Sequence, residues 1–292
     1  MTRFLKIFTL SLLASSVISQ EVDSESPEGW AMAYTTASSL NLGQITPRDV
    51  NPGDLTISAE LSSIPSLSKE QQKVGFNGLK DEDLNKSPVF GRVRISYGLA
   101  WNTTAEASWT PPIEIDGAKP ETLWGLAFSR PLIKGQNIDL GVRIFMSRGD
   151  VEADVTCSKD MVAIEPYTPG NLSGCVGISK DKLTIDHQGI EATAVFKTLG
   201  EKLTPWFSFA STKIDPSVKV DAPLQYGQEV VDISSSNTTQ TYTIGFDYNY
   251  SGNQLLNFAT SYTPLDVNRP VQLGDRDSFW NCLLYTSDAA DD

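Results

Sequence analysis

Residues 55–62 read Leu55-Thr56-Ile57-Ser58-Ala59-Glu60-Leu61-Ser62, with apolar and polar side chains in strict alternation. Side chains of a β-strand point alternately to its two faces, so this stretch predicts a strand with one apolar and one polar face. The alternation recurs in residues 92–101, 138–147 and 241–250. No stretch of the sequence shows a helical period over the length that a globular helix needs, although residues 65–85 allow one or two turns. The chain is therefore expected to be all-β.

Three features favour a transmembrane β-barrel over a soluble β-sandwich, whose strands also alternate. Several strands extend over about 9–13 residues, whereas soluble strands average about five or six and tilted membrane strands need about 9–11. The polar faces carry small or charged side chains, which a polar lumen accommodates. Aromatic residues gather near strand ends, as in the girdles at the two membrane interfaces. The predicted girdle consists of Trp101, Trp109, Trp124, Tyr248, Tyr250 and Tyr262.

Short and long connections alternate along the chain. Outer-membrane barrels have short periplasmic turns and longer external loops, so this alternation predicts an antiparallel up-and-down barrel with its chain start in the periplasm. About ten strands are expected, with eight or twelve left open, because residues 29–40 could supply another strand. The predicted strands begin near residues 54, 89, 104, 122, 138, 183, 203, 238, 254 and 278.

Both ends of the chain carry segments that we exclude from the fold. Residues 1–19 combine a basic start, a short apolar core and small residues before Gln20, which predicts a cleaved secretory signal. Residues 282–292 resemble the translation of a transposase-end sequencing adapter, so we interpret them as an assembly artefact that truncates the last strand. The remaining chain is expected to form a periplasmic N-terminal segment at 20–53 and the β-barrel at 54–281.

These features together resemble the Gram-negative outer-membrane β-barrel proteins, over nearly all of residues 20–281. Segments 74–78, 84–92 and 262–267 resemble signatures of one bacterial family, to which we attach no activity. The resemblance implies a location in the bacterial outer membrane, contact with membrane lipid and lipopolysaccharide, and insertion by the barrel-assembly machinery. It leaves the oligomeric state open.

The composition of the chain restricts its possible binding partners and indicates the oxidation state of its cysteines. The 292 residues include 23 basic and 36 acidic side chains, for a formal net charge of −13. This balance argues against nucleic acid, whose affinity depends on Lys and Arg at the phosphates. With Cys282 assigned to the adapter, Cys157 and Cys175 remain as an even pair, which predicts a disulfide in an exported protein. Two free thiols are the alternative.

Eight charged residues on the polar strand faces are predicted to face the lumen. They could form a charged, solute-selective pore. The alternative, which we favour, is a salt-bridged interior that fills a narrow barrel, because small barrels are filled by side chains. The predicted lumen charges are Glu60, Arg92, Arg94, Glu106, Asp139, Arg143, Glu191 and Asp247.

The sequence offers few candidates for catalysis or metal binding. His187, the single histidine, lies where the apolar phase shifts by one residue, which indicates a surface or β-bulge position. No motif of the omptin proteases or of the outer-membrane lipid-A deacylases accompanies it, so we predict no catalytic residue and no cofactor. Asp150, Glu152 and Asp154 share one strand face and are a weak candidate for Ca²⁺, against a solvated rim. The run Asp81-Glu82-Asp83 is a weaker signal of the same kind.

The favoured function is a non-enzymatic outer-membrane barrel for envelope structure, surface interaction or limited small-solute passage. One alternative is a barrel hydrolase acting on lipid or peptide, which requires His187 within hydrogen-bond reach of a Ser or Asp. The other is a secreted soluble β-sandwich binding protein, which would partition into the aqueous phase on detergent extraction.

Overall fold

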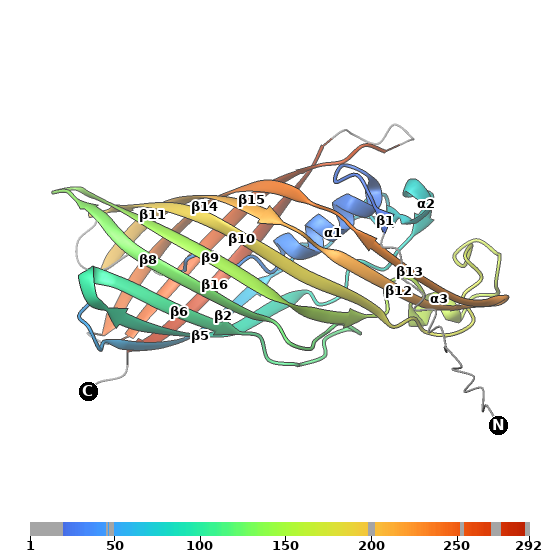
Figure 1. The fold of residues 1–292 in the computed structure, drawn as a ribbon, viewed down its shortest axis with the longest axis horizontal. Coiled ribbons are helices and arrows are strands. Elements are labelled where there is room, and N and C mark those ends of the chain that lie inside the picture. Colours follow the sequence, from blue (N-terminus) through green and yellow to red (C-terminus); the bar gives the residue numbers. More distant parts are fainter. Residues whose placement is uncertain are drawn as a thin grey trace, which may run out of the picture.

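A computed structural model describes residues 20–289, except 45, 47–49, 198–201, 252–253 and 270–275, with the backbone alone for 276–289. Ten long antiparallel strands form a β-barrel (Figure 1). Each pairs with the next along the chain, and β16 pairs with β2, so the pairing returns to the first strand. The predicted strand starts lie within two residues of the observed ones. The strands are β2 (Leu55–Ser63), β5 (Val89–Leu99), β6 (Thr103–Trp109), β8 (Trp124–Lys134), β9 (Ile138–Ala153), β10 (Asp181–Phe196), β11 (Leu203–Ile214), β14 (Asn237–Ser251), β15 (Gln254–Asp266) and β16 (Arg276–Ala289).

Strand β16 includes most of the segment that we interpret as sequencing adapter. Its pairing with β2 runs from Cys282 opposite Ser63 to Ala289 opposite Thr56. Strand pairing uses backbone N–H and C=O groups, which every residue except proline supplies. The adapter interpretation therefore stays a prediction. Residues 290–292 and the predicted signal at 1–19 lie outside the described residues.

The barrel strands place polar residues inside and apolar residues outside. On β2, Ser58, Glu60 and Ser62 are buried, whereas Ile57 and Leu61 are about half exposed, at 46% and 51%. A soluble sandwich would bury the apolar face instead, so the alternative of a secreted soluble β-sandwich is wrong. Other exposed apolar residues on the strands include Val93, Ile95, Leu126, Phe128, Leu140, Ile144, Ile190, Phe207, Ile244 and Phe258.

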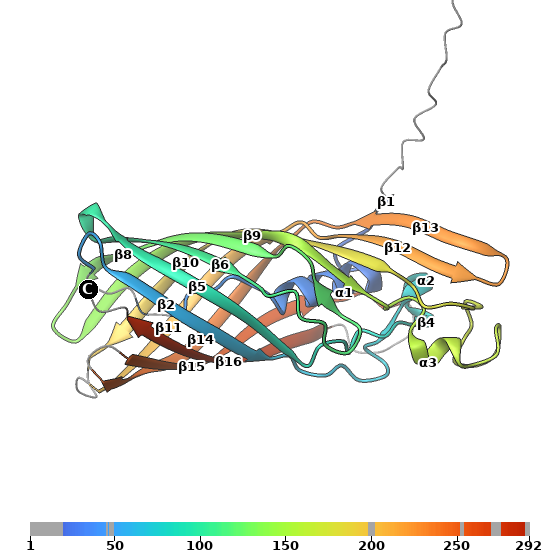
Figure 2. The same ribbon diagram turned by 90° about the horizontal axis from the view of Figure 1, so that it is seen from below.

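The two ends of the barrel differ, as the loop lengths predict. The short-turn end holds the connections between β5 and β6, where η1 (Ala100–Asn102) forms the turn, and between β8 and β9. The long-loop end carries further elements (Figure 2). These are β3 (Lys73–Val74), α2 (Gly75–Gly78), β4 (Lys80–Asp81), β7 (Lys119–Pro120), α3 (Lys159–Val162) and the hairpin of β12 (Ser217–Leu224) with β13 (Gly227–Ser234). The alternation of connection lengths predicts a long loop between β11 and β14, and the structure forms this hairpin within it.

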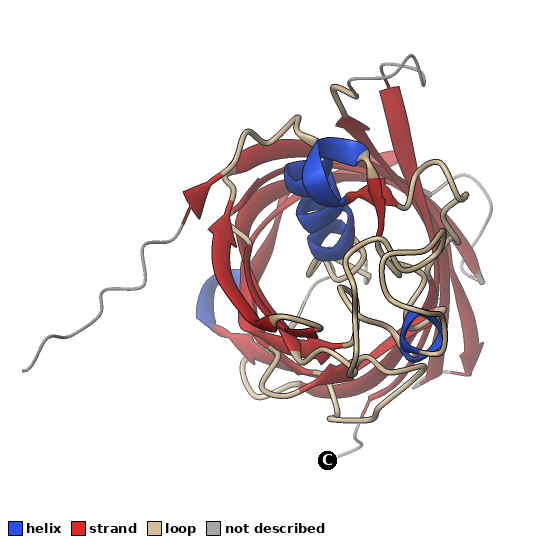
Figure 3. Ribbon diagram, turned by 90° about the vertical axis from the view of Figure 1, so that its right-hand side faces the viewer, coloured by secondary structure: helices blue, strands red, loops and turns tan. Residues whose placement is uncertain are grey.

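The N-terminal segment runs through the barrel. β1 (Gln20–Glu21) pairs in parallel with β13 at the long-loop end, and α1 (Pro27–Ala37) lies inside the ring of strands (Figure 3). The possible strand at residues 29–40 is wrong, because α1 occupies these positions. The reason is physical, because α1 buries residues on all sides and a helix of this kind needs protein cover all round. The periplasmic placement of residues 20–53 stays a prediction.

Two further observations concern the long-loop end and the helices. Cys157 and Cys175 are joined by a disulfide, as predicted, which closes the loop that contains α3. Among the described residues, no helix is long and apolar enough to cross a membrane.

Candidate functional site

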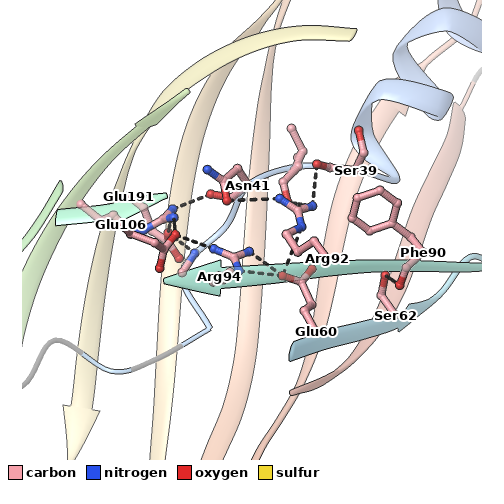
Figure 4. A network of polar contacts seen from close by, with 12 residues as sticks. Ser39, Asn41, Glu60, Ser62, Phe90, Arg92, Arg94, Glu106 and Glu191 are labelled. Carbon is pink, nitrogen blue, oxygen red and sulfur yellow. Dashed lines mark hydrogen bonds and ion pairs between the residues drawn. The ribbon is translucent and has the colours of Figure 1, made fainter. Parts of the chain in front are cut away.

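Six of the predicted lumen charges meet inside the barrel, and we call this group the lumen network (Figure 4). Three arginines and three glutamates contribute equal and opposite formal charge. Five are buried, and the Glu106 side chain is only 13% exposed. The members are Glu60 on β2, Arg92 and Arg94 on β5, Glu106 on β6, Arg143 on β9 and Glu191 on β10.

Strand register creates the network. Glu60 lies directly opposite Arg92, and Glu191 lies directly opposite Arg143. Residues opposite one another in an antiparallel pair have Cβ atoms about 5 Å apart, and diagonal neighbours are still within reach of long side chains. Glu106 is opposite Ser96, which places it diagonal to Arg94.

Arg94 is at the centre of these ion pairs, and its side chain is fully buried. Its Nη2 lies 2.5 Å from Glu60 Oε2, and its Nη1 lies 2.7 Å from Glu106 Oε1. Glu106 Oε1 also accepts a hydrogen bond from Arg143 Nη2 at 2.6 Å. Charges buried to this degree are tolerated only when they are paired and hydrogen-bonded. The network is therefore a connected unit rather than a set of independent pairs.

The N-terminal segment is bonded to this network through its backbone. Arg92 Nη2 donates to the carbonyls of Ser39 at 2.8 Å and Leu40 at 3.1 Å. Arg92 Nη1 donates to Asn41 Oδ1 at 3.1 Å, and Arg143 donates to the Asn41 carbonyl. The three residues follow the end of α1 inside the lumen. The bonds satisfy their backbone carbonyls, and a buried carbonyl without a partner would cost free energy.

Further contacts hold the segment on both sides of the network. The Gly43 N–H donates to Glu191 Oε2 at 2.7 Å. Nearer the short-turn end, Thr46 Oγ1 donates to Asp247 Oδ2 at 2.8 Å. At the other end, the Tyr34 hydroxyl donates to the Pro65 carbonyl at 2.7 Å. We call residues 27–44 together with Thr46 the plug, because they occupy the lumen between these contacts.

One wall glycine permits the close approach of the plug. A Cβ atom on Gly125 of β8 would lie 2.6 Å from Asn41 Nδ2 and 2.7 Å from Ser108 Oγ. Contacts this short cannot persist, so any larger residue at position 125 must displace Asn41 or the wall. The absence of a side chain at Gly125 thus makes room for the plug.

The remaining predicted lumen charges lie elsewhere. Asp139 forms an ion pair with Lys197 at 2.7 Å beside the short β8–β9 turn. Asp247 is fully buried and accepts hydrogen bonds from Trp206 Nε1 at 3.2 Å and Asn257 Nδ2 at 2.6 Å. Both charges are therefore satisfied outside the lumen network.

Five of the six predicted aromatic girdle residues lie at the two barrel ends. Trp109 and Trp124 face each other across β6 and β8 at the long-loop end. Trp101, Tyr248 and Tyr250 lie at or beside the short-turn end and are exposed. Tyr262 lies within β15 and is half-buried. Their role as an interface girdle stays a prediction.

The structure does not assemble the acidic residues into a calcium site. Asp150 accepts a hydrogen bond from Thr184 and forms an ion pair with Lys182 at 3.0 Å. Asp154 forms an ion pair with Lys86 at 3.0 Å. Within the described part of the chain, no group of three His, Cys, Asp or Glu side chains could hold a metal ion. Lysines therefore pair with Asp150 and Asp154, two of the three acids in the predicted row.

His187 is a buried wall residue. Its Nε2 accepts a hydrogen bond from the Asn41 N–H at 3.1 Å, and its Nδ1 has no hydrogen-bond partner among the described residues. The predicted surface or bulge position is wrong, because β10 pairs with β9 without interruption over residues 181–196. The apolar phase shifts because the inward side chains change from polar, as at Glu191, to apolar, as at Ile185.

The fold and the site together define a class of protein. An outward apolar surface, a ring of paired strands and a buried network of charges inside it are the properties of a transmembrane β-barrel of the outer-membrane type.

Comparisons with known proteins do not identify a family for this chain. No protein-family model and no curated protein matches the chain. It is similar to the outer membrane protease OmpT of Escherichia coli, with 10% identity, a TM-score of 0.42 and coverage of 82% of this chain and 94% of that one. It is also similar to the toluene transporter TodX of Pseudomonas putida, with 8% identity, a TM-score of 0.32 and coverage of 82% and 90%. A third is the attachment invasion locus protein Ail of Yersinia pestis, with 11% identity, a TM-score of 0.28 and coverage of 82% and 99%.

Sequence reasoning missed the plug, although one local signal was present. Ser26 caps α1 by accepting a hydrogen bond from the Gly29 N–H at 3.1 Å, and Pro27 follows in the first turn. Ser, Pro and Glu in succession are a typical helix start. No sequence signal pointed to Asn41, whose role depends entirely on what surrounds it.

Proposed function

We propose that this protein is a non-enzymatic barrel of the bacterial outer membrane whose lumen is closed at rest by its own plug. In this proposal it acts at its long-loop end, and solute passes only when the plug is displaced. The bonds from Arg92 to Ser39, Leu40 and Asn41 carry the proposal, because they join the plug to a buried, charge-balanced wall.

Conductance in planar bilayers tests the closed lumen. The intact protein is expected to give no stable conductance steps, and a variant lacking residues 20–46 is expected to give them. The deletion removes α1 and the bonds to Arg92, Arg143 and Asp247, but leaves the barrel strands intact. Heat-modifiable migration on gels shows whether the variant has folded. Stable steps from the intact protein, equal to those of the deletion, would contradict the proposal.

A point variant provides a second test with less risk of misfolding. Arg92→Leu removes the guanidinium that bonds three plug residues and is expected to produce transient openings. Arg148→Leu serves as the matched control, because Arg148 is 63% exposed and its ion pair with Asp186 is long, at 3.6 Å. The control is expected to remain as closed as the parent protein.

The contacts of His187 favour a non-enzymatic role. A Ser-His-acid mechanism needs one imidazole nitrogen bonded to the nucleophile and the other to an acid. In the described residues Nε2 instead accepts from a backbone N–H, and the ring packs edge-on against Phe145 with 6.2 Å between centroids. Hydrolysis of lipid or peptide by purified protein that is abolished by His187→Gln would overturn this part of the proposal.

The membrane partners follow from the outward surface. Apolar residues at the outward strand positions suit contact with outer-membrane lipid, and we propose lipopolysaccharide and the barrel-assembly machinery as further partners. Fractionation of cells expressing the protein is expected to recover it with the outer membrane, as a heat-modifiable band. Recovery in the soluble fraction would contradict the proposal.

A further inference from the structure

A cavity of about 210 Å³ lies between the plug helix α1 and the barrel wall. Its lining comes from α1, from the 82–90 stretch, and from the parts of β9, β10, β12 and β13 nearest the long-loop end. It is separate from the lumen network, none of whose members lines it.

The lining is mainly apolar although the strands that form it belong to a barrel with polar inward faces. β9 contributes Val151 and Ala153, and β10 contributes Leu183 and Ile185. Met32 of α1 lies across from them. A cavity of about 150 Å³ with apolar walls stays dry and binds benzene, so this one has room for a substituted benzene ring.

One side chain in the lining has an unused polar atom. Glu82 is buried, and its Oε1 accepts a hydrogen bond from Lys80 Nζ at 2.8 Å. Its Oε2 is buried with no hydrogen-bond partner among the described residues. An unsatisfied buried oxygen of this kind costs free energy, which a ligand that supplies the missing hydrogen bond would recover.

The ionisation of Glu82 suits a neutral ligand. Burial raises the pKa of Glu82 to about 8, and the neighbouring Lys80 offsets only part of this effect. The carboxyl group is thus largely protonated at neutral pH and can both donate and accept. The lysines near the cavity are already engaged, because Lys80 also donates to the Thr156 carbonyl at 3.0 Å and Lys86 pairs with Asp83 and Asp154. An anionic ligand would therefore compete with these existing pairs.

We infer that the cavity is a binding site for a small neutral molecule with an apolar body about the size of a substituted benzene ring and one hydroxyl group, which pairs with Glu82. Phenols are the chemical class that meets these requirements. This inference rests on the proposed function, since it names the ligand class taken up at the long-loop end of the closed barrel.

Binding of 4-fluorophenol to the intact protein in lipid nanodiscs, followed by ¹⁹F NMR, tests the inference. Fluorobenzene is the matched probe without a hydroxyl group, and empty nanodiscs correct for partition into lipid. The intact protein is expected to bind 4-fluorophenol saturably at one site. Linear partition equal to that of empty nanodiscs would overturn the inference.

Two pairs of variants localise the binding. Ala153→Phe fills the cavity and is expected to abolish saturable binding, whereas Ala107→Phe adds the same group on the exposed outward face of β6 and leaves binding unchanged. Glu82→Leu is expected to bind 4-fluorophenol with an affinity about tenfold lower than that of Glu82→Gln, because one hydrogen bond changes affinity by about this factor. Fluorobenzene is expected to bind the two Glu82 variants equally.

The outcomes separate the site from the proposed function. Unchanged binding in Ala153→Phe, or an equal loss of both probes in Glu82→Leu, would overturn the site whatever the conductance experiment gives. If Glu82→Leu does not fold, the comparison of Ala153→Phe with Ala107→Phe still shows whether the ligand binds in the cavity. Saturable binding by an intact protein that also conducts would retain the site and reject the closed lumen.

Discussion

The charged and apolar halves of the barrel interior are formed by the same strands but held by different forces. Near the short turns, β9 and β10 present Arg143 and Glu191 to the plug. Near the long loops, the same two strands present Val151 and Ile185 to it. Backbone register is continuous between the two halves. The comparison teaches that the interior chemistry of a barrel is set position by position along each strand, while the inward and outward faces stay fixed.

Removal of Arg94 is expected to have the largest effect on stability, because it disrupts the lumen network in the charged half of the interior. Arg94→Ala leaves Glu60 and Glu106 buried with one cation fewer between them. Breaking a buried ion pair by removing one partner typically costs about 3–5 kcal/mol. We expect a loss of this size in the free energy of unfolding, measured by urea titration in liposomes. Arg148→Ala, at an exposed pair, is expected to cost about 1 kcal/mol or less.

The second-largest effect is expected in the pH dependence of stability, which distinguishes the apolar half of the interior from the charged half. The pKa of Glu82 in the folded protein, about 8, is above its ordinary value of 4.5. The folded state therefore binds more protons between these two values. The stabilisation from this group is complete below pH 4.5 and is lost as the pH rises through 8, by at most about 1.4 kcal/mol per pH unit.

Glu82→Gln isolates this contribution. The glutamine side chain does not titrate, so the variant is expected to lose the decline in stability between pH 5 and 8 that the parent protein shows. Urea titrations at several pH values make the measurement. Identical slopes for parent and variant would show that Glu82 does not carry the pH dependence.

Truncation of Ile185 probes the apolar half directly. The side chain is buried beside the cavity, so Ile185→Ala removes packing on a wall that already has a void. Such truncations cost about 2–5 kcal/mol, and we expect about 2–3 here because a side chain beside a void packs against fewer neighbouring atoms. Ile190→Ala is the control, since Ile190 is 53% exposed on the outward face of the same strand. A larger loss in the control would contradict the assignment of faces.

The smallest effect is expected at the start of the plug helix. Ser26→Ala removes the side-chain oxygen that accepts from the Gly29 N–H, and loss of an N-cap typically costs about 1 kcal/mol. Ser24→Ala, two residues earlier, should be neutral. The same urea titration measures both variants, and equal values would show that the cap adds nothing once α1 is enclosed.

The sequence predicted the wall of the barrel well and its contents poorly. Alternation assigned Glu60, Arg92 and Arg94 to the inward face because side-chain direction in a strand has a period of two. It did not assign their partners, which depend on register between strands. The sequence did not predict the plug helix, because a helix that is enclosed on all sides has no polar stripe and therefore no helical period to detect.

The misinterpretation at His187 has a similar origin. The period-two pattern was read from apolar residues alone, on the assumption that the inward face stays polar along its length. Ile185 faces inward as Glu191 does. The inward face therefore changes from polar to apolar along the strand, and in the sequence this looks like a reversal of side-chain direction. A phase shift within a long barrel strand can thus mark the edge of an apolar cavity.

The path of the N-terminal segment also constrains how the barrel is assembled. The closing pair joins Ser63 to Cys282, residues from opposite ends of the chain, and contacts of such long sequence separation are slow to form. The plug is continuous with β2, the strand that completes the ring. It must therefore be in place before β16 docks, or be drawn in afterwards, N-terminus first, from the short-turn end, where the chain enters β2. In the first route the plug would template the wall that later encloses it, and the order of strand docking would decide whether the barrel closes full or empty.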